Sequence, residues 1–363
     1  MSNDVLGAVV DHEASDLVGL TEALVAVDSV SGNEAALCDA IQQRLALRAP
    51  HLVIDRVGNS LVARTMLARD RRIILGGHLD TVPANGNAIP RRDGDLLFGL
   101  GTADMKGSVA AMLALAEQCA APAVDVTFLF YECEEVEEAR NGLRSILAAQ
   151  PELLNGDLAI LAEPTDGWVE AGCQGTLHVR ATYRGVRAHS ARPWTGKNAI
   201  HAASAALARV VAAAEILAPR VIDGMEFTQA LQVVRIDGGV ANNVVPDEAS
   251  ITVNRRFAPD ITCEQARAET NALFEDADVI EVLNESPGAL PGLEHPLVAE
   301  FVDRAGGRVR SKLGWTDVAR FTPLGIPALN FGAGDPLLAH TAEEHVSTAS
   351  LKHTYDVLRE VLA

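Results

Sequence analysis

The chain has 363 residues, a formal net charge of -19, 48% apolar residues and 4% aromatic residues. Such an acidic surface repels nucleic acid and anionic membranes, and so few aromatic side chains argue against a platform that stacks bases. The length suggests two domains, or one domain with an insertion. We therefore expect neither a nucleic-acid partner nor a membrane partner.

The cysteines and the N-terminus predict the cellular compartment. The five cysteines are scattered and form no CxxC pair, which indicates reduced thiols rather than disulfides or a thiolate metal site. The N-terminal stretch "MSNDVLGAVVDHEAS" carries acids where a signal peptide has basic residues. The longest apolar run, "SVAAMLALAEQCAAPAV", is interrupted by Glu117 and Gln118 and is too short to span a bilayer. We expect a soluble, cytoplasmic protein.

The first half of the chain predicts an α/β layer. Residues 16–48 have the pattern of two amphipathic helices, with Ser31 or Asn33 as the N-cap of the second. Strand and helix patterns then follow along the chain. Strands are expected at 51–57, 60–66, 71–77, 125–131 and 157–163, and helices at 107–119 and 139–150. Strands that alternate with helices indicate a largely parallel sheet.

From about residue 175 the pattern becomes β-α-β-β-α-β, the ferredoxin-like order. The expected elements are strand 176–185, helix 198–215, strands 228–239 and 248–258, helix 263–276 and strand 279–286. The stretch "SPGALPG" resembles a linker, and helix and strand patterns resume after it. We predict an α/β domain in two segments, 1–174 and 287–363, interrupted by an inserted domain of residues 175–286.

Residue types that bind metals recur where the predicted strands end. His78 and Asp80 lie two positions apart, so on an extended chain they face the same side. Taken alone, His78 would be a strand-end residue capped by its neighbour, and Asp104 would be a helix N-cap. Ligands of open α/β sheets bind at the carboxyl ends of strands, and four such ends carry suitable side chains. The candidate ligands are His78, Asp104, Glu135, Glu163 and His340.

Five acids crowd the seven positions 132–138: Glu132, Glu134, Glu135, Glu137 and Glu138. Like charges at this spacing repel and raise one another's pKa unless a cation neutralises some of them. Nitrogen and oxygen ligands suit zinc, cobalt or manganese. Three carboxylates balance two divalent ions and one bridging hydroxide, which favours two metals. We expect a metal ligand at 135, a general base at 134, and solvated or capping roles for the other three.

Seven motifs occur in order along nearly the whole chain: "GGHLDTVP", "GLGTADMKG", "ECEEVE", "LAEPT", "RGVRAHSARP", "NNVVPDEASITVNRRF" and "AHTAEEHV". Together they resemble the aminoacylase, acetylornithine deacetylase and succinyl-diaminopimelate desuccinylase family of metallohydrolases. The resemblance implies two Zn²⁺ per subunit, with Co²⁺ able to replace one of them. It makes Glu134 the catalytic acid/base and Asp80 a catalytic-site residue behind the ligands. Its metal assignments are His78 and Glu163 to one ion, Glu135 and His340 to the other, and Asp104 as the bridge.

The same resemblance makes the inserted domain a lid and a homodimer interface. His189 would reach the partner subunit's site and stabilise the oxyanion; without the resemblance it would be a surface histidine. The substrate's polar ends would be held by Asn243, Arg256, Arg320 and Thr316. Gln174 and Trp315 depart from the family pattern, which has a basic residue and a small residue there, and both departures concern the acyl pocket.

Within the family, "GWTDVARFTPLGIPALNFGAGDPLLAH" resembles one bacterial desuccinylase branch. This implies hydrolysis of N-succinyl-LL-2,6-diaminopimelate to succinate and LL-2,6-diaminopimelate, a step of lysine and diaminopimelate biosynthesis. The alternatives are an acetylornithine deacetylase or another N-acyl amino acid hydrolase or dipeptidase, and a binuclear phosphoesterase. A further alternative is a catalytically silent binding protein of the same fold, against which the intact ligand set and Glu134 argue.

Overall fold

A computed structural model describes residues 3–363 and divides into two compact units. The first unit comprises the chain up to Ala171 together with residues 292–310 and 320–363, and the second comprises 172–291 and 311–319. The short segment 311–319 therefore differs from the sequence expectation, which assigns it to the α/β domain. Within the second unit, the thiol of Cys173 donates to the carbonyl oxygen of Thr316 in this segment at 3.7 Å, across 143 positions of the chain. A contact across so many intervening residues leaves no local signal in the sequence.

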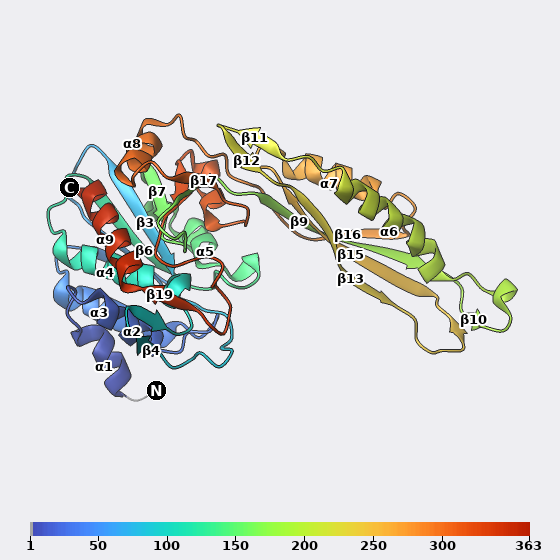
Figure 1. Cartoon of the computed structure of the whole chain (residues 1–363), viewed down its shortest axis with the longest axis horizontal. Coiled ribbons are helices and arrows are strands. Elements are labelled where there is room, and N and C mark those ends of the chain that lie inside the picture. The colour runs from blue at the N-terminus through green and yellow to red at the C-terminus, as the bar shows by residue number, and fades with distance from the viewer. Residues whose placement is uncertain (1–2) are drawn as a thin grey trace. The chain divides into compact units, whose positions relative to one another are not determined.

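The first unit contains the mostly parallel sheet that the alternation predicts, and the α/β expectation is confirmed (Figure 1). Its four central strands, β6, β3, β7 and β18, are parallel, and antiparallel strands flank them. In spatial order the eight strands are β1 (Val53–Val57), β2 (Ser60–Arg64), β6 (Asp125–Tyr131), β3 (Arg72–His78), β7 (Leu158–Leu161), β18 (Ala328–Asn330), β8 (Val169–Ala171) and β17 (Val309–Ser311).

Helices surround this sheet, and α4 and α9 lie in front of the strands in Figure 1. The helices are α1 (Asn3–Asp11), α2 (Leu17–Val25), α3 (Ala35–Arg48), α4 (Gly107–Gln118), α5 (Gly142–Ala149), α8 (Pro296–Arg304) and α9 (Thr348–Leu362). A small sheet of β4 (Arg91–Asp93), β5 (Leu96–Phe98) and β19 (His345–Ser347) adjoins them. Within residues 3–363, no helix is long and apolar enough to cross a membrane.

Two helix starts differ from the sequence expectation. The N-cap of α3 is Glu34, whose side chain makes no capping bond, so neither Ser31 nor Asn33 caps this helix. The helix expected over 139–150 begins only at Gly142, because the Asn141 side chain accepts a hydrogen bond from the backbone N–H of Leu143. Glu138–Arg140 instead form a short 3₁₀ turn, η2.

Close packing of α4 beneath β3 depends on a glycine. Every residue of β3 from Ile73 to His78 is buried. At Gly77, a Cβ atom would lie 2.8 Å from Met105 Cε and 3.3 Å from Met112 Sδ. A larger residue would therefore push α4 away from the strand, and β3 would deliver His78 to a different position.

The second unit has the ferredoxin-like order that the sequence predicts. Its sheet runs β13 (Ala230–Gly238), β15 (Glu248–Phe257), β9 (Gly175–Arg184) and β16 (Val279–Ser286), with every neighbouring pair antiparallel. Helices α6 (Ala199–Glu215) and α7 (Cys263–Ala272) cover one face of it (Figure 1). Shorter elements are β10 (Ala188–His189), β11 (Arg220–Ile222), β12 (Met225–Phe227) and β14 (Val244–Val245).

Candidate metal centre

The candidate ligands gather because parallel strands end at one edge of the sheet. β3 ends at His78 itself, and Glu135 follows the end of the neighbouring strand β6 by four residues. Glu163 follows the end of β7, which pairs with β3 on its other side. Asp104 lies in η1 (Thr102–Lys106), the turn that leads into α4, where the backbone of Asp104 itself is not helical. Chain segments far apart in sequence thus meet at a single edge.

The described residues include two three-residue groups that share one carboxylate. His78, Asp104 and Glu163 form the first group, and Asp104, Glu135 and His340 form the second; within each group the ligand atoms lie within 4.8 Å of one another. Asp104 Oδ1 lies 3.0 Å from His78 Nε2, and Asp104 Oδ2 lies 3.4 Å from His340 Nε2. His340 Nε2 lies 2.8 Å from Glu135 Oε1. A carboxylate with one oxygen toward each histidine has the arrangement of a bridging ligand.

These separations fit divalent cations. Two atoms bound tetrahedrally to one ion at about 2.0–2.1 Å lie about 3.3 Å apart, close to the spacing of the Asp104 oxygens from the two imidazoles. His78 Nδ1 lies 3.0 Å from the carbonyl oxygen of Asp80, which only an N–H can satisfy. The lone pair of His78 is therefore on Nε2, the nitrogen that faces Asp104. The donor set contains only nitrogen and oxygen.

The pKa shifts in the cluster show that it favours added positive charge. Burial lowers the pKa of His78, but the hydrogen bond and charge of Asp104 outweigh this and hold it well above the usual value. Hydrogen bonds to Asp104 and Glu135 raise the pKa of His340 to about 10. Burial raises the pKa of Asp104, but the two histidines outweigh it and lower the pKa below its usual range. A divalent cation would satisfy the same preference.

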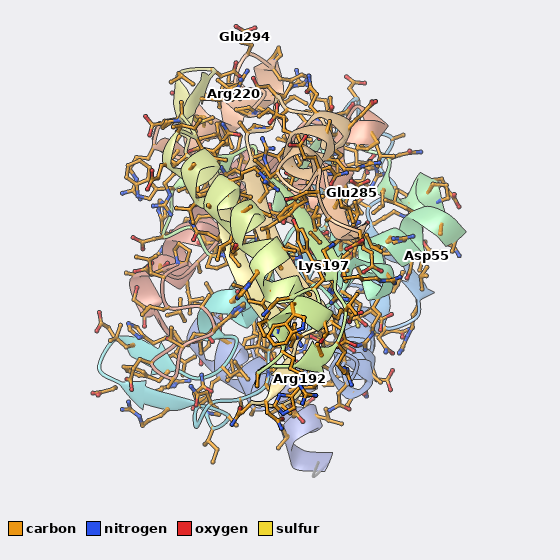
Figure 2. All side chains as sticks on the ribbon, turned by 90° about the vertical axis from the view of Figure 1, so that its right-hand side faces the viewer. Asp55, Arg192, Lys197, Arg220, Glu285 and Glu294 are labelled. Atoms are coloured by element: carbon orange, nitrogen blue, oxygen red, sulfur yellow. The ribbon has the colours of Figure 1, made fainter. Side chains whose placement is uncertain are left out.

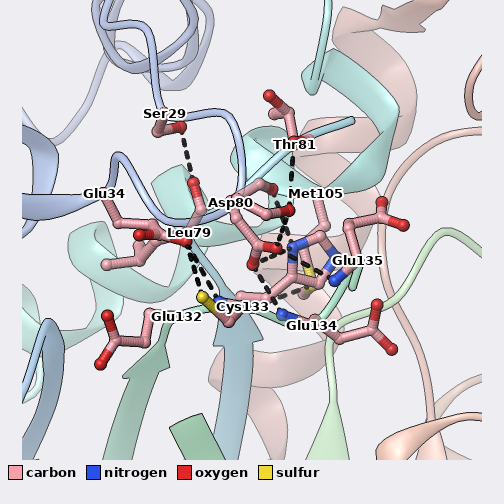
Figure 3. Close-up of polar contacts among 12 residues, drawn as sticks. Ser29, Glu34, Leu79, Asp80, Thr81, Met105, Glu132, Cys133, Glu134 and Glu135 are labelled. Carbon is pink, nitrogen blue, oxygen red and sulfur yellow. Dashed lines mark hydrogen bonds and ion pairs between the residues drawn. The ribbon is translucent and has the colours of Figure 1, made fainter. Parts of the chain in front are cut away.

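Asp80 supports the cluster in two ways that the sequence does not separate. Its backbone oxygen, rather than its carboxylate, accepts the His78 N–H, since the nearest carboxylate oxygen is 3.6 Å away. The carboxylate instead accepts the backbone N–H of Glu134 at 2.9 Å and that of Glu135 at 3.0 Å (Figure 3). It also accepts the hydroxyl of Ser31 at 2.7 Å. Asp80 therefore fixes both a histidine and the loop that carries two glutamates.

The five crowded acids have different surroundings. A carboxylate oxygen of Glu134 lies within 4.8 Å of ligand atoms of His78 and Glu135, which suits a base beside the cluster. Glu132 points away from Glu134 and Glu135 in Figure 3, and it accepts the backbone and side-chain N–H groups of Asn59, each at 2.9 Å. It thus anchors the β1–β2 turn rather than being solvated.

The outer two acids face arginines. Glu138 Oε1 lies 3.4 Å from Arg320 and 3.5 Å from Arg144. Glu137 lies 3.9 Å from Arg140. Arg320, a candidate for holding the substrate, is thus already paired within the first unit.

Two buried residues near the cluster were missed in the sequence. Glu344 Oε1 accepts the backbone N–H groups of Ala103 at 3.0 Å and Asp104 at 3.1 Å, and burial raises its pKa to about 7. Glu344 lies inside the motif "AHTAEEHV", so its position was visible but its contact was not. Glu34 accepts the backbone N–H of Cys133 at 3.2 Å, and nothing in its sequence surroundings resembles a ligand pattern.

The second unit places its candidate residues in two separate groups. β10 pairs with β14, and Ser190 N–H donates to the carbonyl oxygen of Asn243 at 2.9 Å, so the exposed His189 and Asn243 are neighbours. Exposed Arg192 and Lys197, labelled in Figure 2, lie in the following segment before α6.

Arg256 lies near the opposite end of β15, paired with Thr176 at the start of β9. Cys173, two residues before β9, donates its thiol to the carbonyl oxygen of Thr316 at 3.7 Å. The length of β15, ten residues or about 30 Å, separates this group from His189. One chain therefore does not bring the two groups together.

The two departures from the family pattern both make hydrogen bonds within the second unit. Gln174 is buried and donates to the carbonyl oxygen of Thr228 at 2.6 Å. The indole N–H of Trp315 donates to the carbonyl oxygen of Pro287 at 3.1 Å. Both side chains thus tie together the chain segments that flank β9 and follow β16.

The first unit is an α/β layer that brings together two groups of histidine and carboxylate side chains, and a ferredoxin-like unit interrupts it along the chain. This combination is typical of a metallohydrolase with two metal ions. Residues 74–363 match the model of peptidase family M20/M25/M40, and the chain belongs to this family. A Corynebacterium glutamicum succinyl-diaminopimelate desuccinylase is 41% identical over 359 residues, covering 96% of each chain. A Mycobacterium tuberculosis protein provisionally given the same name is 48% identical over 349 residues, covering 96% of this chain and 98% of its own.

Solved structures share the fold. A Staphylococcus aureus tripeptidase superposes with a TM-score of 0.79 at 21% identity, covering 96% of this chain and 98% of its own. The Bacillus subtilis YxeP protein, described as a dinuclear metal binding peptidase of the M20 family, superposes with a TM-score of 0.68 at 15% identity, covering 96% and 97%.

Proposed function

We propose that this protein is a cytoplasmic enzyme that hydrolyses N-succinyl-LL-2,6-diaminopimelate to succinate and LL-2,6-diaminopimelate. The observation that carries the proposal is the 41% identity, over nearly the whole of both chains, to a protein named for this activity. The paired groups that share Asp104 support two divalent ions per chain. We propose zinc for both, with cobalt able to replace one, as the family resemblance implies; the nitrogen and oxygen donors suit either metal.

The residues of the first unit divide the chemistry. His78, Asp104, Glu135, Glu163 and His340 would hold the ions, which supply a water of lowered pKa and polarise the amide carbonyl. Glu134 accepts a proton from the attacking water while the oxygen of that water forms the new bond to the carbonyl carbon. The same carboxyl group returns the proton to the amine nitrogen as the carbon–nitrogen bond breaks. Asp80 keeps Glu134 in place through its backbone N–H.

The succinyl group requires a cation that an acetyl group does not, because it ends in a carboxylate. Arg256 is partly buried, and burial lowers the pKa of its guanidinium. A substrate carboxylate beside it would stabilise the charged form of the guanidinium. Arg320 is paired with Glu138 at 3.4 Å, so a substrate carboxylate would have to displace that partner. These two arginines are the proposed succinyl-binding residues, with Thr316 as a further substrate contact. Asn243, which neighbours His189, would contact the substrate from the partner subunit.

The substrate assignment predicts a higher kcat/KM for N-succinyl-LL-2,6-diaminopimelate than for N-acetylornithine. Arg256→Met or Arg320→Met should lower this preference by about tenfold to a hundredfold, because one charge-assisted bond is lost for the succinyl substrate alone. Arg144→Met is the matched control, since Arg144 also contacts Glu138 but is exposed. Steady-state kinetics on both substrates, with a phosphodiester as a third, provide the measurement.

Faster cleavage of N-acetylornithine by the wild-type protein would replace the proposal with an acetylornithine deacetylase. Hydrolysis of the phosphodiester alone would support the phosphoesterase alternative. A metal-loaded protein that cleaves none of the three would be a binding protein of the same fold.

We also propose a homodimer in which His189 completes the partner subunit's site and stabilises the oxyanion. The support is the separation within one chain: about 30 Å of β15 lies between His189 and the Arg256–Thr316 group, so these two groups of the same chain cannot contact one substrate. The edge strand β13 carries exposed Val234 and Ile236, which offer an apolar surface to a second copy.

The dimer proposal predicts complementation between two inactive chains. Glu134→Gln mixed with His189→Ala should regain up to about a quarter of wild-type activity, because half the dimers are hybrids and one of their two sites is complete. The control mixes Glu134→Gln with a chain that carries both substitutions, in which no complete site can form. No recovered activity, in a mixture where native mass spectrometry detects hybrids, would contradict action by His189 across the dimer.

A further inference from the structure

Glu34 is a fully buried carboxylate that points away from its own helix. It stands at the N-cap position of α3 without capping it. Its Oε1 atom accepts the backbone N–H of Gly32 at 2.7 Å and that of Cys133 at 3.2 Å, and it accepts the Cys133 thiol at 3.4 Å (Figure 3). The residue therefore links the start of α3 to the loop that follows β6.

Three consecutive backbone N–H groups of that loop end on carboxylates. Glu34 accepts the N–H of Cys133, and Asp80 accepts those of Glu134 and Glu135. Cys133 has a φ of 57°, in the left-handed region that non-glycine residues rarely adopt. Such a conformation persists only where the surroundings hold it, and Glu34 contacts both the N–H and the thiol of this residue.

The segment that carries Glu34 also holds the end of β3. Ser29 Oγ donates to the carbonyl oxygen of Leu79 at 2.7 Å, and Ser31 Oγ donates to the carboxylate of Asp80 at 2.7 Å. Residues 29–34 thus contact Asp80 and include Glu34, the two residues whose carboxylates accept the N–H groups of the loop. A shift at Glu34 would reach Glu134 and Glu135 through their backbone.

The burial of Glu34 argues against a purely local role. Its second oxygen, Oε2, is buried and has no hydrogen-bond partner within the described residues 3–363. Burying a carboxylate with one oxygen unsatisfied costs free energy of folding. A residue with an exposed side chain at this N-cap position would not have that cost. Besides the N–H of Gly32, the carboxylate contacts the backbone N–H and the thiol of Cys133, the residue before Glu134.

We infer that Glu34 is a positioning residue, which sets the backbone of Cys133–Glu135 so that Glu135 binds its metal ion and Glu134 faces the substrate. The inference rests on the proposed function for Glu134, but its effect on Glu135 depends only on metal binding. Glu34 touches no ligand atom itself and acts through the loop.

The test compares Glu34→Ala, which removes the accepting oxygen, with Glu34→Gln, which keeps it. Glu132→Ala is the matched control: it deletes a carboxylate from the same loop, but one whose side-chain hydrogen bonds within residues 3–363 go to Asn59. Metal-free protein is titrated with Co²⁺ and followed by calorimetry and by visible absorption, which reports the ligand geometry. Thermal unfolding of each variant shows that folded protein is compared.

Glu34→Ala should lower the affinity for one of the two Co²⁺ ions by about tenfold to a hundredfold and leave the affinity for the other unchanged. It should lower kcat by a similar factor with little change in KM, since the substrate contacts remain. Glu34→Gln should restore both quantities to near the wild-type values, and Glu132→Ala should leave both unchanged. If Glu34→Ala does not fold, Glu34→Asp withdraws the oxygen by one methylene and should show the same changes at smaller size.

The inference is overturned if the folded Glu34→Ala or Glu34→Asp protein binds both Co²⁺ ions with wild-type affinity and spectrum. It is also overturned if Glu132→Ala produces the same loss as Glu34→Ala. A wild-type protein that does not cleave the succinyl substrate, while Glu34→Ala still loses one Co²⁺ ion, would refute the proposed function and retain the positioning role.

Discussion

Glu134→Gln is expected to lower kcat by about 10²–10⁴-fold while the protein keeps both metal ions. An amide cannot accept the proton of the attacking water, so the general base is lost. The backbone N–H of residue 134 still donates to Asp80 at 2.9 Å, so the loop keeps its position. Steady-state kinetics and elemental analysis of the same preparation measure the two quantities together.

Glu135→Gln is the control for this result, because it changes the neighbouring residue by the same atom. Glu135 Oε1 lies 2.8 Å from His340 Nε2, so its substitution should weaken metal binding rather than proton transfer alone. Near-normal turnover by Glu134→Gln would show that the base is another group.

Asp104→Ala is expected to lose both metal ions and to reduce activity more than Glu134→Gln does. Among the described residues, Asp104 is the member common to the His78–Glu163 group and the Glu135–His340 group. Its two oxygens face the two histidines at 3.0 Å and 3.4 Å. Elemental analysis after gel filtration measures the remaining metal content.

His340→Ala provides the contrast, since His340 belongs to only one of the two groups and should cost one ion. In Asp104→Ala the turn η1 should stay folded, because Glu344 accepts the backbone N–H groups of residues 103 and 104. Two ions retained by Asp104→Ala would contradict the bridging assignment.

The sequence could indicate that the candidate metal ligands lie close together, because three of them stand at or just after the end of a recognisable strand. His78, Glu135 and Glu163 come at or just after the ends of β3, β6 and β7, and the parallel pairing of those strands brings them together. The period of the apolar pattern predicts the strands, and the geometry of a parallel sheet then predicts a common edge. The ferredoxin-like order of the second unit was also predictable, because the period of the apolar pattern distinguishes its strands from its helices.

The supporting contacts were not predictable, because they join residues far apart in the chain. Cys133 and Glu34 are 99 positions apart, and Asp104 and Glu344 are 240 apart. Local spacing carries no record of such pairs. The N-cap of α3 was predicted wrongly for a related reason: the sequence favours Ser31 or Asn33 locally, while the Ser31 hydroxyl bonds to Asp80 instead.

The most direct test of the proposed two-metal desuccinylase is a zinc titration of metal-free protein in the presence of N-succinyl-LL-2,6-diaminopimelate. Succinate and LL-2,6-diaminopimelate are quantified at each step, and bound metal is measured by elemental analysis. We predict no cleavage without metal, a rate that reaches its maximum when two ions are bound per chain, and equal amounts of the two products. Full activity in protein without bound divalent metal, or no succinate at any zinc loading, would contradict the account.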